Sequence, residues 1–131
     1  MLYGCRVDAA KMVELSTRWW QEVWREGEVD VVDEILTDPF VRHSATGTSV
    51  SPRAEYKRML SEFQRTLHRP ETSIDARDIV DDRIWTRATS RGVNLQTGER
   101  SVVSWLLLQR VDHDRIAEHW AVTVAGVDWT A

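Results

Sequence analysis

The fold of this chain is decided by residues 101–124, whose sequence is SVVSWLLLQRVDHDRIAEHWAVTV. Two runs rich in β-branched, aromatic and leucine residues, 101–111 and 115–124, flank three polar residues, 112–114. Such runs favour β-strands, and a short charged link between them suits a tight turn. The pattern therefore predicts a β-hairpin at this end of the domain.

The first strand of this hairpin is apolar on both faces, because successive side chains of a strand point to opposite sides. One face holds Val103, Trp105, Leu107, Gln109 and Val111. The other face holds Val102, Ser104, Leu106, Leu108 and Arg110. We therefore expect both faces to be covered, the inner one by the rest of the domain and the outer one by a second copy in a homodimer.

The second strand carries a histidine on a face of small residues. The alternation groups His119 with Ala121 and Thr123, and such small neighbours leave room for a cavity. A slip of one residue in the register would instead turn Glu118 and Trp120 inward. We favour His119 inward, because an isolated carboxylate in an apolar interior is costly.

The composition predicts a single globular domain, residues 1–131, that buries a core without disulfides or metals. Hydrophobic residues make up 42% of the chain and charged residues 29%, which excludes intrinsic disorder. Seven tryptophans stand against two tyrosines and two phenylalanines. Large rigid indoles suit either a dense small core or the wall of an apolar ligand pocket.

Charge and cysteine content exclude several classes of function. The net charge of −4 lacks the basic face that nucleic-acid binding requires, so no nucleic-acid partner is expected. The lone Cys5 excludes an internal disulfide framework and a cysteine-based zinc site, which favours a reducing cytoplasm. The apolar run in residues 1–11 is too short for a signal peptide, and no stretch is long enough to span a membrane.

The N-terminal half predicts helices. Asp8 is a good N-cap for a helix over 9–26, and Gly27 stands where a helix commonly ends. A short helix is expected over 31–36. A third helix opens at Ser51 and Pro52 and continues to about Leu67, with Met59, Leu60, Phe63 and Leu67 facing inward.

The remaining segments predict strands. Residues 40–43 form a short extended piece after Pro39, and 45–49 form a small polar loop. Strands are expected over 72–80 and 83–94, before the two arms of the hairpin. Helices followed by a strand meander favour an α+β domain in which a curved antiparallel sheet wraps around the N-terminal helices as a cone, whose open end suits a ligand pocket.

Four segments resemble the SnoaL-like group of the nuclear-transport-factor-2-like superfamily. They are WWQEVWREGEVDVVDEIL at 19–36, DPFVRHS at 38–44, SPRAEYKRML at 51–60 and DHDRIAEHW at 112–120. The group includes polyketide cyclases, ketosteroid isomerases, limonene epoxide hydrolase, dehydratases and non-catalytic binding modules. The resemblance implies a cone-shaped α+β fold with an apolar cavity and, commonly, a homodimer. The fold alone does not imply a reaction.

The same resemblance suggests two site residues near the first helix and strand. His43 stands where ketosteroid isomerases hold the carboxylate that moves a proton, so it is a candidate general base. A structural histidine bonded to the backbone is the alternative. Trp20 falls where those enzymes carry an oxyanion-binding tyrosine, and its indole N–H can donate a hydrogen bond but not a proton. Packing of Trp20 against the sheet is the alternative.

Three catalytic patterns of the relatives each lack a carboxylate in this chain. Arg87-Ala88-Thr89 has the spacing of the Arg-x-Asp of limonene epoxide hydrolase without its acid, and Arg87 is either a ligand contact or a surface residue. Leu107 stands near the protonated aspartate of the isomerases. Residues 121–124 hold none of the acid that many SnoaL-like sequences carry after the closing tryptophan.

Two hypotheses of function follow. The first is a cofactor-free isomerase, cyclase or dehydratase in which His43 and His119 exchange protons with a small hydrophobic substrate. The second is a non-catalytic module that binds an apolar ligand in the same cavity. The expected ligand contacts are Trp20, Arg87, Trp105, Leu107 and Trp120, with no metal or other cofactor. The first hypothesis requires both histidine rings to face one point in one cavity, within the reach of a bridging water.

Overall fold

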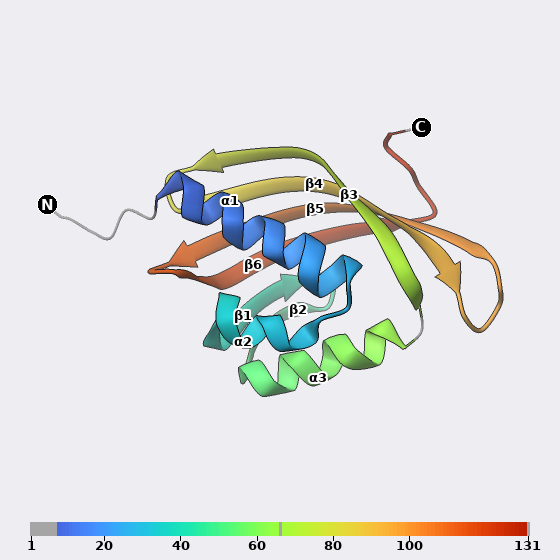
Figure 1. Ribbon diagram of the computed structural model, residues 1–131, viewed down its shortest axis with the longest axis horizontal. Coiled ribbons are helices and arrows are strands. Elements are labelled where there is room, and N and C mark those ends of the chain that lie inside the picture. Colours follow the sequence, from blue (N-terminus) through green and yellow to red (C-terminus); the bar gives the residue numbers. More distant parts are fainter. Residues whose placement is uncertain (1–7, 66, 131) are drawn as a thin grey trace, which may run out of the picture.

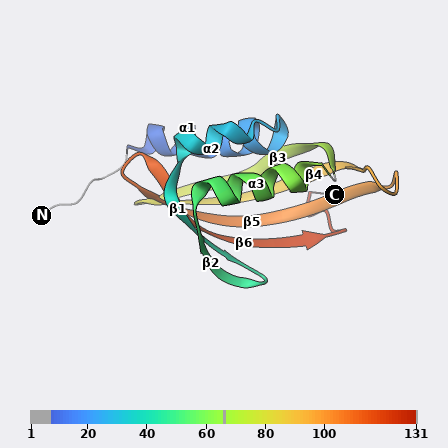
Figure 2. The same cartoon turned by 90° about the horizontal axis from the view of Figure 1, so that it is seen from below.

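The chain forms a layer of helices on one face of a curved sheet, as the side view in Figure 2 shows most clearly. The computed structural model describes residues 8–65 and 67–130, and the side chains of 67–70 lie outside that description. Within these residues a six-stranded sheet has the strand order β2-β1-β6-β5-β4-β3 (Figure 1). The strands are β1 (Leu36–Ser44), β2 (Gly47–Ser51), β3 (Leu67–Val80), β4 (Arg83–Asn94), β5 (Arg100–Asp112) and β6 (Arg115–Ala125). The α+β class predicted from the sequence is confirmed.

The first helix begins where the sequence predicts and then changes its winding. Asp8 caps α1 (Ala9–Arg18), its carboxylate accepting a hydrogen bond from the backbone N–H of Ala10 at 3.0 Å. The helix continues as a π-helix, η1 (Trp19–Arg25), and Gly27 follows it with a φ of +74°. The wider π turn was not predicted from the helical spacing. It brings Trp19 and Trp24, five residues apart, into edge-to-face contact with their ring centroids 6.0 Å apart.

The next two helices differ from the prediction mainly at their ends. A single 3₁₀ turn, η2 (Val29–Val31), leads into α2 (Val32–Ile35). Helix α3 (Arg53–Gln64) ends three residues earlier than expected, and β3 begins at Leu67, whose predicted inward side chain lies outside the described residues. Of the residues expected to face inward, Leu60 is buried, whereas Met59 and Phe63 are 39% and 42% exposed. None of the described helices is long and apolar enough to cross a membrane.

Strand β2 replaces the polar loop expected over 45–49. It pairs antiparallel with β1, so that Phe40 lies opposite Ser51 and His43 opposite Thr48. Four of its five residues are exposed, and the fifth is half-buried. A strand that buries no apolar side chain leaves no hydrophobic alternation in the sequence, which explains why this hairpin was missed.

The β5–β6 hairpin forms as predicted, with His113 at a φ of 57° in its turn. Gln109 pairs with His119 and Leu107 with Ala121, which puts these residues on the inner, helix-covered face. The outer face is only partly covered within one chain. The hydroxyl of Ser104 donates to the carbonyl oxygen of Val127 at 2.6 Å, which places the C-terminal segment over that residue. Farther along the hairpin, Leu106 is 41% exposed.

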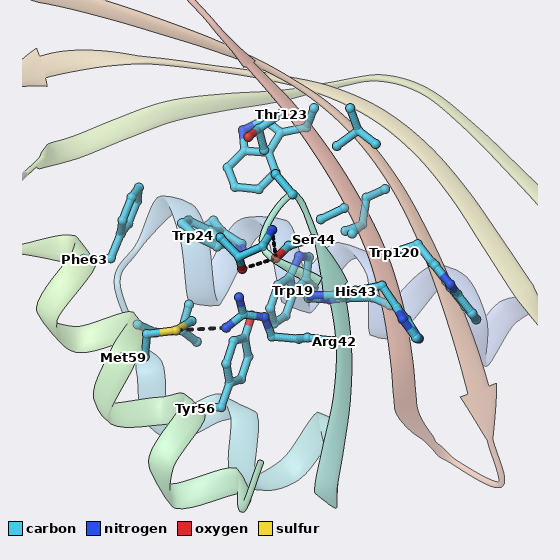
Figure 3. Close-up of a pocket in the computed structure, with 18 residues that line it drawn as sticks. Trp19, Trp24, Arg42, His43, Ser44, Tyr56, Met59, Phe63, Trp120 and Thr123 are labelled. Carbon is cyan, nitrogen blue, oxygen red and sulfur yellow. Dashed lines mark hydrogen bonds between the residues drawn. The ribbon is translucent and has the colours of Figure 1, made fainter. Parts of the chain in front are cut away.

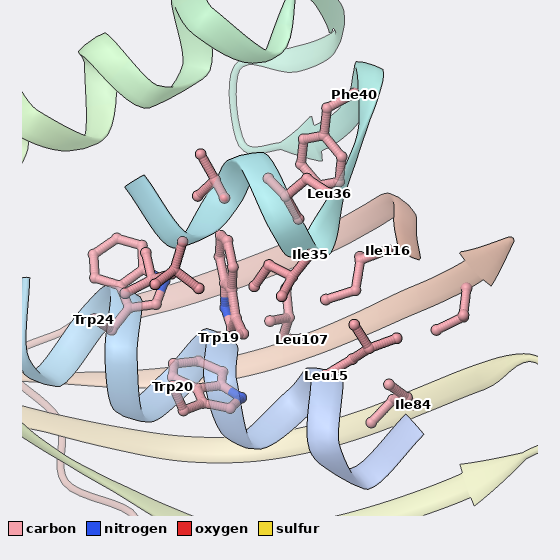
Figure 4. Packing of buried hydrophobic residues seen from close by; sticks show 14 of the residues in the cluster. Leu15, Trp19, Trp20, Trp24, Ile35, Leu36, Phe40, Ile84, Leu107 and Ile116 are labelled. Atoms are coloured by element: carbon pink, nitrogen blue, oxygen red, sulfur yellow. The ribbon is translucent and has the colours of Figure 1, made fainter. Parts of the chain in front are cut away.

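The hydrophobic core lies between the helices and the inner face of the sheet. Figure 4 shows tryptophans of η1 packed with side chains of α2, β1 and the central strands. Its largest fully buried members include Trp19, Phe40, Leu15, Leu107 and Ile116. Next to this packed region, between the helices and the sheet, the interior opens into a cavity.

Candidate functional site

A cavity of about 700 Å³ lies between the helices and the inner face of the sheet (Figure 3). Strands β5 and β6 supply its floor, η1 supplies one wall, and α3 covers it. The end of β1 and the turn that follows form its rim. The described residues that line it are Trp19, Trp24, Arg42, His43, Ser44, Ala45, Thr46, Tyr56, Met59, Leu60, Phe63, Trp105, Leu107, His119, Trp120, Ala121, Val122 and Thr123.

His119 faces this cavity from β6, as the sequence predicts. It is only 4% exposed, and its ring makes edge-to-face contacts with Phe40, Trp19 and Tyr56, with centroids 4.9, 5.7 and 6.2 Å away. Its Nδ1 has no hydrogen-bond partner among the described residues. Burial, followed by the charge of Arg42, lowers the pKa of His119 to about 3, so the ring is neutral at physiological pH.

Arg42 is the cation of the cavity. It pairs with His119 across β1 and β6, so both side chains leave the sheet on the inner face. The guanidinium lies 5.2 Å from the centre of the Tyr56 ring, and its Nη1 donates to the sulfur of Met59 at 2.9 Å. Burial raises the pKa of Tyr56, which keeps its hydroxyl protonated and able to donate. The inner face thus offers a cation, a neutral imidazole and a phenol.

His43 leaves the sheet on the face opposite to His119, although both residues line the same cavity, as expected. That both rings reach one point in it stays a prediction. His43 pairs with Trp120 across β1 and β6 and therefore leaves the sheet on its outer face. The two rings stack there with centroids 4.8 Å apart and planes inclined by 7°. The His43 Nδ1 lies 2.7 Å from the hydroxyl of Thr48, and its Nε2 lies 2.6 Å from a carboxylate oxygen of Glu118.

His43 nevertheless borders the mouth of the cavity. The pairing of β1 with β6 ends at His43 and Trp120, and β6 continues without that neighbour to Ala125. Residues of both faces then reach the opening, which explains why Val122 of the outer face lines it together with Thr123 of the inner face. In Figure 3, His43 and Trp120 lie together, away from Tyr56 and Met59.

The five predicted ligand contacts divide into three groups. Trp105 and Leu107 lie in the floor of the cavity, where contact with a ligand stays a prediction. Trp120 reaches only the mouth, from the outer face. Trp20 is a correction, because it packs edge-to-face on Trp105 at 5.7 Å, is 2% exposed and does not line the cavity.

Arg87 is a second correction. It pairs with Leu106, whose side chain is exposed on the outer face, and it lies between the inward, buried residues Thr86 and Ala88. Its side chain therefore points away from the cavity. Arg87 is a surface residue, the alternative that the sequence left open.

Sequence reasoning missed Arg42, Tyr56 and the pair Trp19 and Trp24 as wall residues. Two signals were available. Phe40 is apolar and begins an alternation that puts Arg42, not His43, on the same face. Tyr56 stands four residues before Leu60, so the two share one face of α3. The tryptophans had no such signal, because their orientation depends on the π turn.

The described lining contains no aspartate or glutamate. In the described part of the chain no three His, Cys, Asp or Glu residues lie close enough together to hold a metal ion. The polar groups of the lining are those of Arg42, His43, Tyr56 and His119, the indole N–H groups of its tryptophans, and hydroxyls near the rim. The indole N–H groups of Trp19 and Trp24 have no partner among the described residues. The arrangement suits an apolar molecule with a polar end.

The fold of the chain is similar to that of other solved structures. A candidate polyketide cyclase from Acidithiobacillus ferrooxidans is 18% identical, with a TM-score of 0.78 over 89% of this chain and 90% of that one. An LEH-like epoxide hydrolase from M. tuberculosis is 15% identical, with a TM-score of 0.72 over 88% and 84%. A protein of ketosteroid isomerase-like fold from Catenulispora acidiphila is 14% identical, with a TM-score of 0.71 over 82% and 83%.

At these identities the structural likeness shows the fold alone. No curated protein matches the sequence significantly. The model of the SnoaL-like domain matches residues 17–119, which run from the first helix to the cavity histidine and cover most of the chain. The chain therefore belongs to the SnoaL-like domain family.

Proposed function

We propose that this domain binds a small hydrophobic molecule in its cavity and moves a proton on that molecule through His119, as a cofactor-free isomerase, cyclase or dehydratase does. The observation that carries the proposal is the position of His119, a buried imidazole with an unpartnered nitrogen at the wall of an apolar cavity of about 700 Å³. Apolar pockets with a few convergent polar groups are the usual form of small-molecule sites.

The electrostatics of the inner face favour a reaction that develops negative charge. Neutral His119 has one ring nitrogen able to accept a proton. Protonation of His119 is opposed by its burial and by the positive charge of Arg42. Both effects become weaker when the proton comes from the bound molecule, because the anion that forms pairs with the imidazolium of His119 and with the guanidinium of Arg42. Removal of a proton next to a carbonyl, which gives an enolate, is a reaction of this kind.

A non-catalytic binding module is the second candidate, and a specific observation favours it. The second histidine lies on the outer face, bonded to Glu118, and the described lining holds no carboxylate. Among the described residues that line the cavity from the inner face, His119 is thus the single acid/base group whose ordinary pKa lies near neutrality, and its pKa is lowered. Binding without reaction needs nothing more than the cavity supplies.

Deuterium exchange separates the two candidates. Molecules that copurify with the protein would be extracted, identified by mass spectrometry and returned to the protein in D₂O. Proton transfer at carbon predicts a gain of one mass unit with the wild type and with His43→Gln, and none with His119→Gln. Binding of the extracted molecule without any exchange by the wild type would establish the non-catalytic module. Failure to bind any extracted molecule would refute both candidates.

We propose in addition that the outer face pairs two copies of the chain. Trp85, Leu106 and Val122 are 42%, 41% and 58% exposed on that face, and their strands β4, β5 and β6 are neighbours. The prediction is a dimeric mass by light scattering at micromolar concentration, and a monomeric mass for Leu106→Glu. A monomeric wild type would refute the dimer without affecting the cavity.

A further inference from the structure

Arg42 is placed as a binding group and not as part of a surface ion pair. It stands on the inner face of β1, beside His119, and it lines the cavity with an intermediate exposure. The residue before it, Val41, and the residue after it, His43, leave the strand on the other face. The guanidinium is therefore directed into the apolar interior by the strand itself.

The partners of Arg42 are poor ones for a guanidinium. Its one hydrogen-bond acceptor among the described residues is the thioether sulfur of Met59, a weak acceptor, and its other neighbour is the face of Tyr56. No carboxylate of the described residues lies within ion-pair distance. Other arginines do find such partners, for example Arg18 with Glu22 at 3.0 Å and Arg110 with Glu118 at 3.0 Å.

His119 is a second polar residue of the same wall that lacks a hydrogen-bond partner. The ring is 4% exposed, and its Nδ1 bonds to nothing in the described part of the chain. A buried polar group without a partner is unfavourable by about 1–3 kcal/mol. Such groups are retained in native proteins where a ligand or water completes them. Arg42 lacks a strong acceptor and a counter-charge, and the Nδ1 of His119 lacks a partner among the described residues.

We propose that the natural ligand is a small hydrophobic carboxylic acid, whose carboxylate binds Arg42 and lies beside His119 while its apolar body fills the cavity. The guanidinium fork matches a carboxylate with two parallel hydrogen bonds. The apolar body contacts the floor and wall made by Trp105, Leu107 and Trp24. A cationic ligand is excluded by repulsion from Arg42, and a neutral one leaves the guanidinium without a counter-charge.

This inference rests on the proposed binding function, and it names the class of ligand. The experiment compares 2-naphthoate with 2-naphthamide, which share one aromatic body and differ in charge. Calorimetric titration of the wild type should show at least about tenfold tighter binding of the acid, equivalent to about 1.4 kcal/mol. Arg42→Gln should bring the two dissociation constants within about twofold of each other, chiefly by weakening the acid.

Two further variants keep the test decisive. Arg87→Gln removes an arginine from the outer face and should leave the tenfold preference unchanged. Arg42→Lys keeps the charge and should retain most of the preference, so the proposal stays testable where Arg42→Gln fails to fold, as judged by circular dichroism. Equal affinity of the wild type for both compounds would refute the proposal that the ligand is an anion, and would leave the binding function of the cavity standing. Binding of neither compound would overturn the cavity function together with this inference.

Discussion

Two histidines on neighbouring strands have opposite surroundings, although their positions differ by a single step of the register. His43 on β1 pairs with Trp120 on β6, whereas His119 pairs with Arg42. His43 has both ring nitrogens within hydrogen-bond distance of a side chain, Thr48 on one side and Glu118 on the other. The Nδ1 of His119 has no partner among the described residues, and aromatic rings enclose the side chain.

The strand face, and not the residue type, decides the surroundings of a histidine in this sheet. On the outer face, Glu118 bridges His43 and Arg110, and the bond to His43, ahead of that to Arg110, lowers the pKa of Glu118. This network joins the β1–β2 hairpin to β6, and its polar side chains bond to one another. On the inner face the Nδ1 of His119 has no partner among the described residues and Arg42 has only a thioether acceptor, so that face retains the capacity to bind.

Truncation of a large apolar residue on each face should give the largest contrast in stability. Phe40 is 1% exposed and packs against Tyr56 and His119, so Phe40→Ala should lower the free energy of unfolding by about 3–5 kcal/mol. Val122 is 58% exposed on the outer face, so Val122→Ala should lower the free energy of unfolding of a monomer by less than about 0.5 kcal/mol. Urea denaturation at constant pH measures both.

The outcome for Phe40 decides whether the inner face is packed as described. A loss below about 1 kcal/mol would mean that the cavity extends to Phe40 and that its ring has few neighbours. A large loss for Val122→Ala would instead point to a buried outer face, as in the proposed dimer. Repeating that measurement in the Leu106→Glu background separates the two contributions.

The buried histidine, His119, should make stability depend on pH. The pKa of His119 falls from 6.5 to about 3 in the folded protein, chiefly through burial, so the unfolded chain binds more protons between these values. The contribution of His119 to the free energy of unfolding is then fully present above pH 6.5, and it is lost progressively as the pH falls toward 3. Between pH 7 and pH 5 the expected loss from His119 is about 2 kcal/mol.

Besides burial, the charges of Arg42 and His43 lower the pKa of His119, and Tyr56 contacts its ring. Arg42 on β1 stays charged and Tyr56 on α3 stays neutral, since burial raises the Tyr56 pKa. His119→Gln should therefore remove the loss of about 2 kcal/mol between pH 7 and pH 5, while His43→Gln keeps it. Equal slopes for the wild type and His119→Gln, from urea unfolding at each pH, would show that His119 titrates as an exposed histidine does.

The sequence was sufficient for the fold class, the β5–β6 hairpin and the orientation of His119. Each of these depends on long apolar runs whose alternation is set by burial of one face. The resemblance to SnoaL-like proteins is confirmed by the match to residues 17–119. Strand β2 was not predicted, because it buries almost no apolar side chain. The end of α3 was predicted too late, because the helix ends without a glycine at its C-terminus.

The candidate site was predicted less well than the fold. His43 was chosen by analogy with the position of a catalytic carboxylate in relatives, although the alternation from Phe40 selects Arg42 for the same face. Trp20 was chosen in place of Trp19 and Trp24 for a different reason. In a regular helix the phase of a broad aromatic face is ambiguous, and the π turn at Trp19–Arg25 fixes it only in three dimensions.

The smallest effect concerns Gln109, which pairs with His119 on the inner face, is fully buried and has neither amide atom bonded within the described residues. Because a buried amide without partners keeps its full desolvation penalty, Gln109→Met should raise the free energy of unfolding by about 1 kcal/mol in urea denaturation. The control is Gln64→Met, which loses a 2.7 Å bond to the Val23 carbonyl and should destabilise by about 1 kcal/mol. If both variants lose stability equally, Gln109 has a partner after all, and the inner face is not the unpaired surface that distinguishes His119 from His43.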